Sequence, residues 1–339
     1  MEAGKLRWRD RLALLAKAPS TRMARQVAFK WQEHLTPEQL EALNRHAVKI
    51  LSEVDYSKVP HKIANMLFSG EAVLANPFLV HYVRPAVRMA RTNGYEIANI
   101  PIITNPSLTF GGMAVELAPN LRVAELPFGL IFMLREIGRG IVSLNNAMQK
   151  GKFEKSKVSA YLCATISLLM FEPLAKIYPI LQNTFESTTS FSDKILATRA
   201  THALGVFLIL HEIGHICCHH KFGLNENDER REMQEHEADV FAVECILAAK
   251  AANQRVSPFK DAMLIYICGL FVLMDISANE TGLNLDGYPS FKSRYLRILE
   301  DAHASTEVRE TVEKMGFEVQ MAIKPASERV EIVKGMNGL

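Results

Sequence analysis

Apolar residues recur in long runs along most of this chain, as in a mainly helical protein, and only one short section has the features of strands. Near the start, Thr36-Pro37-Glu38-Gln39 combines a helix N-cap, a proline at the first helical position and the glutamine of a capping box. We therefore predict a helix over about residues 37–54.

Three short segments, 97–103, 113–118 and 121–126, carry the best strand signal. They contain β-branched residues and are separated by turn-forming proline, asparagine and glycine pairs. We expect a small sheet. Beside a catalytic helix, its edge strand would offer backbone groups to an extended peptide, although an ordinary structural sheet gives the same pattern.

Helices are predicted again beyond the strands. One begins with Ser192 as its N-cap and ends before Gly223, a residue typical of the position that follows a helix. A second helix carries residues 235–250, and Ser257-Pro258 begins a third. The expected fold class is therefore α+β and predominantly helical.

With 339 residues, of which 48% are hydrophobic, the chain can bury a large core, and the net charge of +2 does not indicate nucleic acid. The most apolar stretches, 158–171 and 262–274, are shorter than the roughly 18 residues that span a membrane, which favours buried helices over a membrane-embedded protease. A basic segment at 5–30 is interpreted as a solvated helix face rather than as a partner or lipid surface.

The cysteines and the first residues bear on localisation. The five cysteines form no C-x-x-C pair and stand in apolar surroundings, and no signal-peptide core is visible. We expect buried, reduced thiols in a cytoplasmic protein with neither a membrane nor a nucleic-acid partner.

The motif His211-Glu212-Ile213-Gly214-His215 indicates the chemistry. Residues four apart lie on one face of a helix, so both imidazoles can bind one ion. A catalytic zinc site takes three protein ligands and leaves its fourth position to water, from which Glu212 would accept a proton. The motif predicts a zinc-dependent hydrolase, most simply a peptidase.

The segment 235–239 supplies the best third ligand. Glu235 is preferred because Asp239, on the same helix face, would accept the free ring N–H of a ligand histidine. Glu232 and Glu237 are competing carboxylates, and His236 is an alternative ligand that lacks a partner at the spacing of Asp239.

Two more histidines follow the motif. His219 lies roughly 12 Å along the helix axis from His211, too far to share its ion, so we expect a helix-end or supporting role. His220 and Lys221 are expected to face the negative end of the helix dipole.

Tyr288-Pro289 and Arg294 form a turn that leads into a helix. Next to a zinc site, the phenol of Tyr288 or the guanidinium of Arg294 would stabilise an oxyanion. We predict a catalytic role for Tyr288 and a supporting role for Arg294, whose alternative is a structural ion pair.

The order of these residues resembles that of zinc peptidases whose third ligand is a glutamate, and most of all the Lit phage-exclusion peptidases of bacteria. The likeness covers roughly residues 128–299, and Tyr288 stands where the related pattern has histidine. The resemblance implies a zincin-like core in which zinc is held by His211, His215 and Glu235, with Glu212 as general base.

The resemblance also implies a restrained cytoplasmic endopeptidase that cleaves a host translation factor when it senses a phage component. The expected partners are thus a protein or peptide substrate and a phage-derived activator. We expect a helical N-terminal region (1–94), a metallopeptidase domain (95–303) and a helical C-terminal tail (304–339).

Two other functions are considered. Regulatory proteases that destroy a transcriptional repressor pair similar motifs, but we identify no helix-turn-helix here. A non-catalytic sensor or scaffold would hold structural zinc, and such sites usually fill all four positions with cysteine and histidine.

Overall fold

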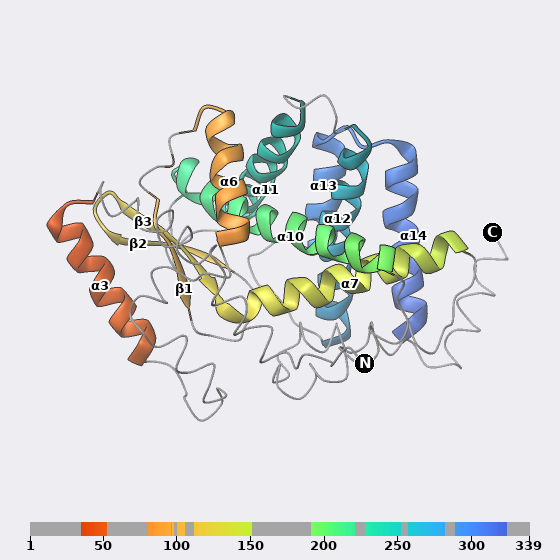
Figure 1. The fold of residues 1–339 in the computed structure, drawn as a ribbon, viewed down its shortest axis with the longest axis horizontal. Helices are drawn as coiled ribbons and strands as arrows, with labels where there is room; N and C mark the ends of the chain where they lie inside the picture. The colour runs from red at the N-terminus through yellow and green to blue at the C-terminus, as the bar shows by residue number, and fades with distance from the viewer. Residues whose placement is uncertain are drawn as a thin grey trace, which may run out of the picture.

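The computed structural model describes residues 35–52, 80–95, 97, 100–105, 112–150, 191–220, 228–251, 257–281 and 289–323. In these ranges the chain is predominantly helical, with one three-stranded sheet, as the α+β class requires (Figure 1). The helices are α3 (Pro37–Ser52), α6 (Val80–Thr92), α7 (Phe128–Lys150), α10 (Phe191–Cys217), α11 (Asp228–Ala251), α12 (Ser257–Thr281), α13 (Phe291–Asp301) and α14 (Thr306–Ile323). The strands are β1 (Ile102–Asn105), β2 (Met113–Ala118) and β3 (Leu121–Pro127).

Helix α3 begins with the predicted capping box. The backbone N–H of Gln39 donates to Thr36 Oγ1 at 3.3 Å, and the backbone N–H of Thr36 donates to Gln39 Oε1 at 3.1 Å. The two residues thus satisfy each other's free donors. The helix prediction is confirmed up to Ser52, where the described part of α3 ends.

The sheet has the strand order β1-β3-β2, with β1 parallel and β2 antiparallel to β3. The second predicted strand is confirmed, and the third extends one residue further, to Pro127. The first prediction, 97–103, is wrong in its bounds, because β1 begins at Ile102. Pro101 precedes it and has no N–H to donate to a ladder, although its carbonyl accepts from Ala124 N–H at 2.9 Å.

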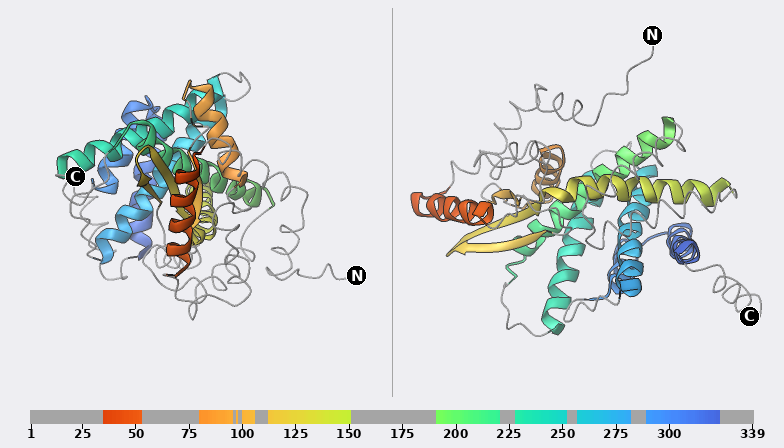
Figure 2. Two further views of the ribbon diagram at one scale, coloured as in Figure 1. Left: turned by 90° about the vertical axis from the view of Figure 1, so that its left-hand side faces the viewer. Right: turned by 90° about the horizontal axis from the view of Figure 1, so that it is seen from below.

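Helices cover both faces of the sheet. Side chains alternate between the faces of a strand, and in β3 Val123 packs with Leu43 of α3 whereas Ala124 packs with Ile216 at the end of α10. Helix α3 lies on the outer side, away from the remaining helices (Figures 1 and 2). The sheet therefore lies beside the helix that carries the histidine motif, as predicted.

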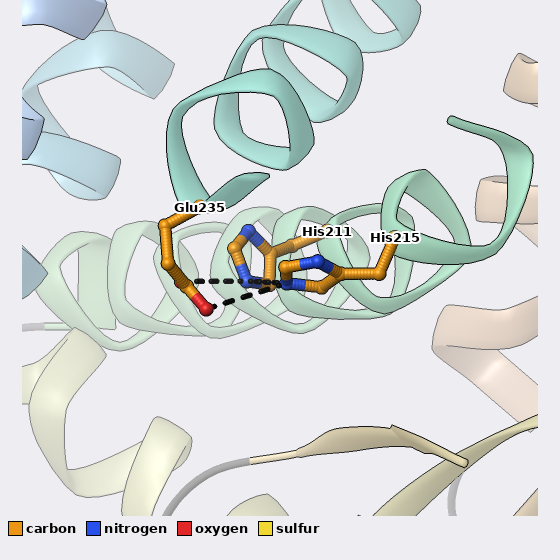
Figure 3. A group of neighbouring side chains, drawn as sticks. All are labelled: His211, His215 and Glu235. Carbon is orange, nitrogen blue, oxygen red and sulfur yellow. Dashed lines mark hydrogen bonds and ion pairs between the residues drawn. The ribbon is translucent and has the colours of Figure 1, made fainter. Parts of the chain in front are cut away.

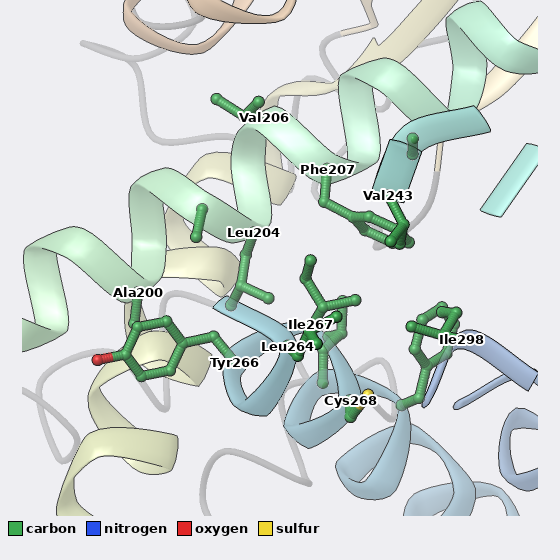
Figure 4. Packing of buried hydrophobic residues seen from close by; sticks show 14 of the residues in the cluster. Ala200, Leu204, Val206, Phe207, Val243, Leu264, Tyr266, Ile267, Cys268 and Ile298 are labelled. Carbon is green, nitrogen blue, oxygen red and sulfur yellow. The ribbon is translucent and has the colours of Figure 1, made fainter. Parts of the chain in front are cut away.

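Helix α10 is the centre of the main core. Its second half, residues 203–216, is buried on nearly all sides, whereas Lys194, Thr198, Arg199 and His202 in its first half are exposed, and the helix contacts α6, α7, α11 and α12. Leu204 and Phe207 are fully buried among side chains of α11, α12 and α13 (Figure 4). The helix begins at Phe191, so Ser192 lies in its first turn instead of capping it.

Within the part of the chain that the structure describes, two helices are long and apolar enough to cross a membrane, in segments Asp193–Cys217 and Lys260–Asn279. The expectation that the apolar stretches are too short is therefore wrong for α12, because the helix continues past residue 274. The same test is passed by core helices of soluble proteins, and 83% of the α10 window and 61% of the α12 window are buried inside the protein.

The core also includes helices on the far sides of the expected domain boundaries. Ala86 and Ala90 of α6 and Val308 and Val312 of α14 are buried in the same cluster as Phe207. The division at residues 94 and 303 stays a prediction. The basic segment 5–30 and the apolar segment 158–171 lie outside the described residues.

The thiols follow the expectation only in part. Cys245 and Cys268 are buried and free, and burial raises the pKa of Cys245 to about 12. Cys218 is free but exposed, because it lies just beyond the last residue of α10.

Candidate metal centre

The candidate site lies where α10 crosses α11. A Cβ added to Gly214 would lie 3.1 Å from the Cα of Ala238, closer than ordinary packing permits. Glycine on one helix and alanine on the other thus let the two backbones approach closely between the motifs 211–215 and 235–239. Because the backbones are close, the side chain of Glu235 on α11 reaches the two histidines on α10.

Three side chains converge at this crossing. The Nε2 atoms of His211 and His215 are 3.1 Å apart, and they lie 3.4 Å and 3.5 Å from the two carboxylate oxygens of Glu235 (Figure 3). In a tetrahedral zinc site with bonds of roughly 2.0–2.2 Å, neighbouring donors are about 3.3–3.6 Å apart. The two His–Glu distances lie in this range and the His–His distance is slightly shorter, so a small adjustment of the rings would let the donor set hold one zinc ion. Among the described residues no other group of three His, Cys, Asp or Glu comes together in this way.

The charges around these donors favour a cation. Burial lowers the pKa of His211, but the carboxylates of Asp239 and Glu235 outweigh it and raise the pKa to about 10. Burial raises the pKa of the Glu212 carboxyl to about 7, and Glu235 adds to this shift. Three carboxylates thus share a buried space with one arginine, Arg294, and a divalent ion would balance them.

His211 is supported by an ion pair. Its Nδ1 lies 2.9 Å from Oδ1 of Asp239, although the ring N–H is not aligned for a hydrogen bond. Arg294 donates twice to Asp239, from Nε to Oδ2 and from Nη2 to Oδ1, both at 2.8 Å. Its Nη1 also lies 3.0 Å from Glu235 Oε2, so one guanidinium holds both carboxylates.

The start of α13 positions that guanidinium. Ser290 caps the helix by accepting from the backbone N–H of Ser293 at 3.0 Å, which sets Arg294 in the first turn. The guanidinium carbon lies 4.8 Å from the ring centroid of Phe271 on α12. Among the described residues, the polar contacts of Arg294 in the site are to the carboxylates of Asp239 and Glu235, an ion-pairing arrangement. Its role in catalysis stays a prediction.

His215 is supported differently. Its Nδ1 lies 2.8 Å from Nδ1 of His220, whose Nε2 lies 2.8 Å from Oε2 of Glu237. His220 is buried, contrary to the expectation that it faces the helix dipole. The reason is that α10 ends at Cys217, well before Gly223, so the chain has already turned back at His220.

The other candidate ligands lie elsewhere. His236 is 3.5 Å from Asp301, Glu232 is exposed, and Glu237 contacts His220 instead of the donor set. His219 is exposed just past the helix end, where its φ of 57° is left-handed. Tyr288 lies outside the described residues, so its role stays a prediction.

Glu212 points toward the sheet side of the site. A Cβ on Gly112, just before β2, would lie 2.5 Å from Glu212 Oε1. A side chain at this position would have to displace the buried carboxylate, so the backbone just before β2 runs directly beside the candidate general base.

Gly112, Gly214 and the packing role of Ala238 were not predicted from the sequence, and His220 was predicted in a different role. Gly214 gave a usable signal, because glycine inside a helix is unfavourable by about 1 kcal/mol and usually marks close packing. The orientation of His220 depends on where α10 ends. The sequence predicted an end just before Gly223, whereas the helix ends at Cys217.

The chain matches the family model described as Peptidase U49 over residues 146–312. The match begins in the last turns of α7, ends within α14, and contains both motifs and Arg294. It supports a peptidase, and therefore a hydrolase that acts on protein or peptide substrates. No curated protein and no solved structure matches the chain.

Proposed function

We propose that this protein is a zinc-dependent endopeptidase with a zincin-like core, in which His211, His215 and Glu235 hold the metal. The observation that carries the proposal is the convergence of these three side chains: the two imidazole Nε2 atoms are 3.1 Å apart and lie 3.4 and 3.5 Å from the two carboxylate oxygens of Glu235. A closed structural site would need a fourth protein donor, and the described residues supply three.

Bound zinc would supply a Lewis acid that polarises the scissile carbonyl and acidifies water. Glu212 would accept the proton of the attacking water and pass it to the leaving amine. Its burial suits this task, because a desolvated carboxylate binds a proton more readily than an exposed one. Asp239 and Arg294 would keep His211 and Glu235 in place.

Strand β2 would bind the substrate. Among the described residues it pairs with β3 on one side only, and it begins at Met113, directly after Gly112, which lies beside Glu212. An extended peptide that added to its other edge would run past the general base and the metal ligands.

The biological setting of the proposal rests on the resemblance to the Lit phage-exclusion peptidases. We propose a restrained cytoplasmic protease that is activated by a phage component and then cleaves a host protein, with a translation factor as the expected target. In this proposal Tyr288 would stabilise the oxyanion.

The mechanism is tested with Glu212→Gln and with Glu232→Gln as matched control, because Glu232 is exposed on α11. Glu212→Gln should bind one zinc per chain and lose cleavage by at least about 10²-fold. Glu232→Gln should retain both properties. Full cleavage by Glu212→Gln would overturn the mechanism, and a wild-type protein purified or reconstituted without stoichiometric zinc would overturn the cofactor.

The substrate is found by comparing protein termini in bacteria that express the wild type or Glu212→Gln, with and without phage. New termini should appear only with the wild type and phage, and should include a translation factor. Identical termini in all four cultures would contradict the phage-defence proposal.

A further inference from the structure

The end of α10 has an unusual turn that brings His220 back to the metal centre. The backbone N–H groups of His219 and His220 donate to the carbonyls of Ile216 and His215, at 3.2 and 3.1 Å. This is the hydrogen-bond pattern of a Schellman motif, in which the residue after the cap is left-handed and is usually glycine. Here that residue is His219, with φ 57°.

A left-handed conformation costs a non-glycine residue roughly 1–2 kcal/mol. The structure keeps it at His219, and as a result His220 is buried against His215 instead of pointing into solvent. Their rings meet almost edge to face, with centroids 5.0 Å apart and planes at 70°.

The proton positions along this contact follow from the ligand geometry. His215 directs Nε2 toward His211 and Glu235, so a metal-binding His215 carries its proton on Nδ1. That proton can be donated only to an unprotonated Nδ1 of His220, 2.8 Å away. The proton of neutral His220 then lies on Nε2, which donates to Glu237 Oε2 at 2.8 Å.

We propose that His220, held by Glu237, is a positioning residue for His215: it accepts the Nδ1–H, fixes the tautomer and the ring plane, and so directs Nε2 to the metal. The inference rests on the proposed zinc site and adds two residues to it. His220 is not a ligand, because it contacts the ring nitrogen of His215 that faces away from the other donors.

The decisive variants are His220→Phe, which fills the space without an acceptor, and His220→Asn, whose Oδ1 can accept from His215. Zinc affinity of the full chain is measured by competition with a chromophoric chelator. Removal of such an outer contact typically weakens metal binding by about 10–100-fold. We expect a loss of that size in His220→Phe and recovery of most of it in His220→Asn.

His219→Gly is the matched control. It removes the neighbouring imidazole, which is exposed, and glycine accepts the left-handed conformation without strain. It should bind zinc as the wild type does. A loss in His219→Gly equal to that in His220→Phe would assign the effect to the turn and overturn the role of His220.

The visible absorption of the Co²⁺-loaded proteins gives a readout that loss of stability alone would not change. The spectrum of folded His220→Phe should differ from that of the wild type, while those of His220→Asn and His219→Gly should be close to it. If the wild type binds zinc and His220→Phe binds it with the same affinity and the same Co²⁺ spectrum, the inference is wrong. If the wild type itself binds no zinc, the proposed function fails first.

Discussion

The two histidines of the motif have the same place on their helix but different supports. His211 rests on Asp239 and Arg294, a charged and almost fully buried pair with direct contacts at 2.8–2.9 Å. His215 contacts the imidazole of His220, which in turn contacts the carboxylate of Glu237, and that side chain is 46% exposed. Removing one partner of a buried ion pair costs much stability, because the other charge is left without a partner. Removing a contact with an exposed carboxylate costs less, because water can replace it.

The difference separates two tasks. We call Asp239 with Arg294 the Arg294 arm, and His220 with Glu237 the His220 arm. The Arg294 arm also contacts Glu235, so it positions a metal donor and stabilises the fold at the same time. The His220 arm contacts one ligand only, and its contribution should appear in metal binding more than in folding. The following variants test this division.

Arg294→Met should cause the largest loss in the free energy of unfolding. It leaves Asp239 and Glu235 as buried carboxylates without a cation, and breaking a buried pair in this way costs about 3–5 kcal/mol. The free energy of unfolding is measured by urea denaturation in the presence of a chelator. Arg294→Lys, which keeps the charge but not the double hydrogen bond, should lose less.

In the same assay His220→Phe should lose only about 1–3 kcal/mol, as expected for one unsatisfied buried donor. Equal losses in Arg294→Met and His220→Phe would remove the distinction between the two arms.

Gly214→Val should damage both arms at once. The added side chain would press on Ala238, and α11, which carries Glu235, Glu237 and Asp239, would have to move away. Overpacking of this kind costs about 1–3 kcal/mol, and we expect zinc affinity to fall further than in any single-arm variant.

Gly316→Ala in α14 is the control glycine. A Cβ there would meet Val272 at an ordinary 3.6 Å, so the change should stabilise the protein by about 0.4–1 kcal/mol and leave zinc binding unchanged. Wild-type zinc affinity in Gly214→Val would mean that the close helix crossing does not position the donors.

The smallest loss of zinc affinity is expected at Glu237, the exposed residue of the His220 arm. Glu237→Gln keeps an oxygen that can accept from His220 Nε2, and the charge it removes is partly exposed. Zinc affinity should fall by less than about fivefold, or about 1 kcal/mol. The corresponding change in the buried arm, Asp239→Asn, should weaken zinc binding by about 10–100-fold. Titrations of both variants under identical conditions compare the arms directly, and equal losses would contradict the comparison.

The sequence predicted those parts of the site that depend on spacing within one helix. His211 with His215, and Glu235 with Asp239, are each four residues apart, and the structure brings all four together. Arg294 could be suggested as an oxyanion-stabilising or ion-pairing group, but its partners could not be predicted, because they lie on a helix far away in the chain. His220 was misjudged because the end of α10 is set by backbone hydrogen bonds at His219 instead of by the next glycine.

The fold was predictable to a similar extent. The capping box fixed the start of α3, and β2 was identified by its turns and β-branched residues. The first strand was not, because its length is decided by pairing with β3, which the pattern of residues 97–103 does not contain. The long-range pairing with β3, not local propensity, determined the bounds of this strand.

The crossing at Gly214 and Ala238 gives a criterion for recognising comparable sites in other chains. The distance between the two motifs along the sequence matters little, since the helices meet at a point fixed by two small side chains. A chain with H-E-x-x-H and a distant glutamate, but with bulky residues at these two places, would keep its helices too far apart for the same donor triangle. Small residues at the third position after the first histidine and after the glutamate are therefore as informative in a sequence comparison as the ligands themselves.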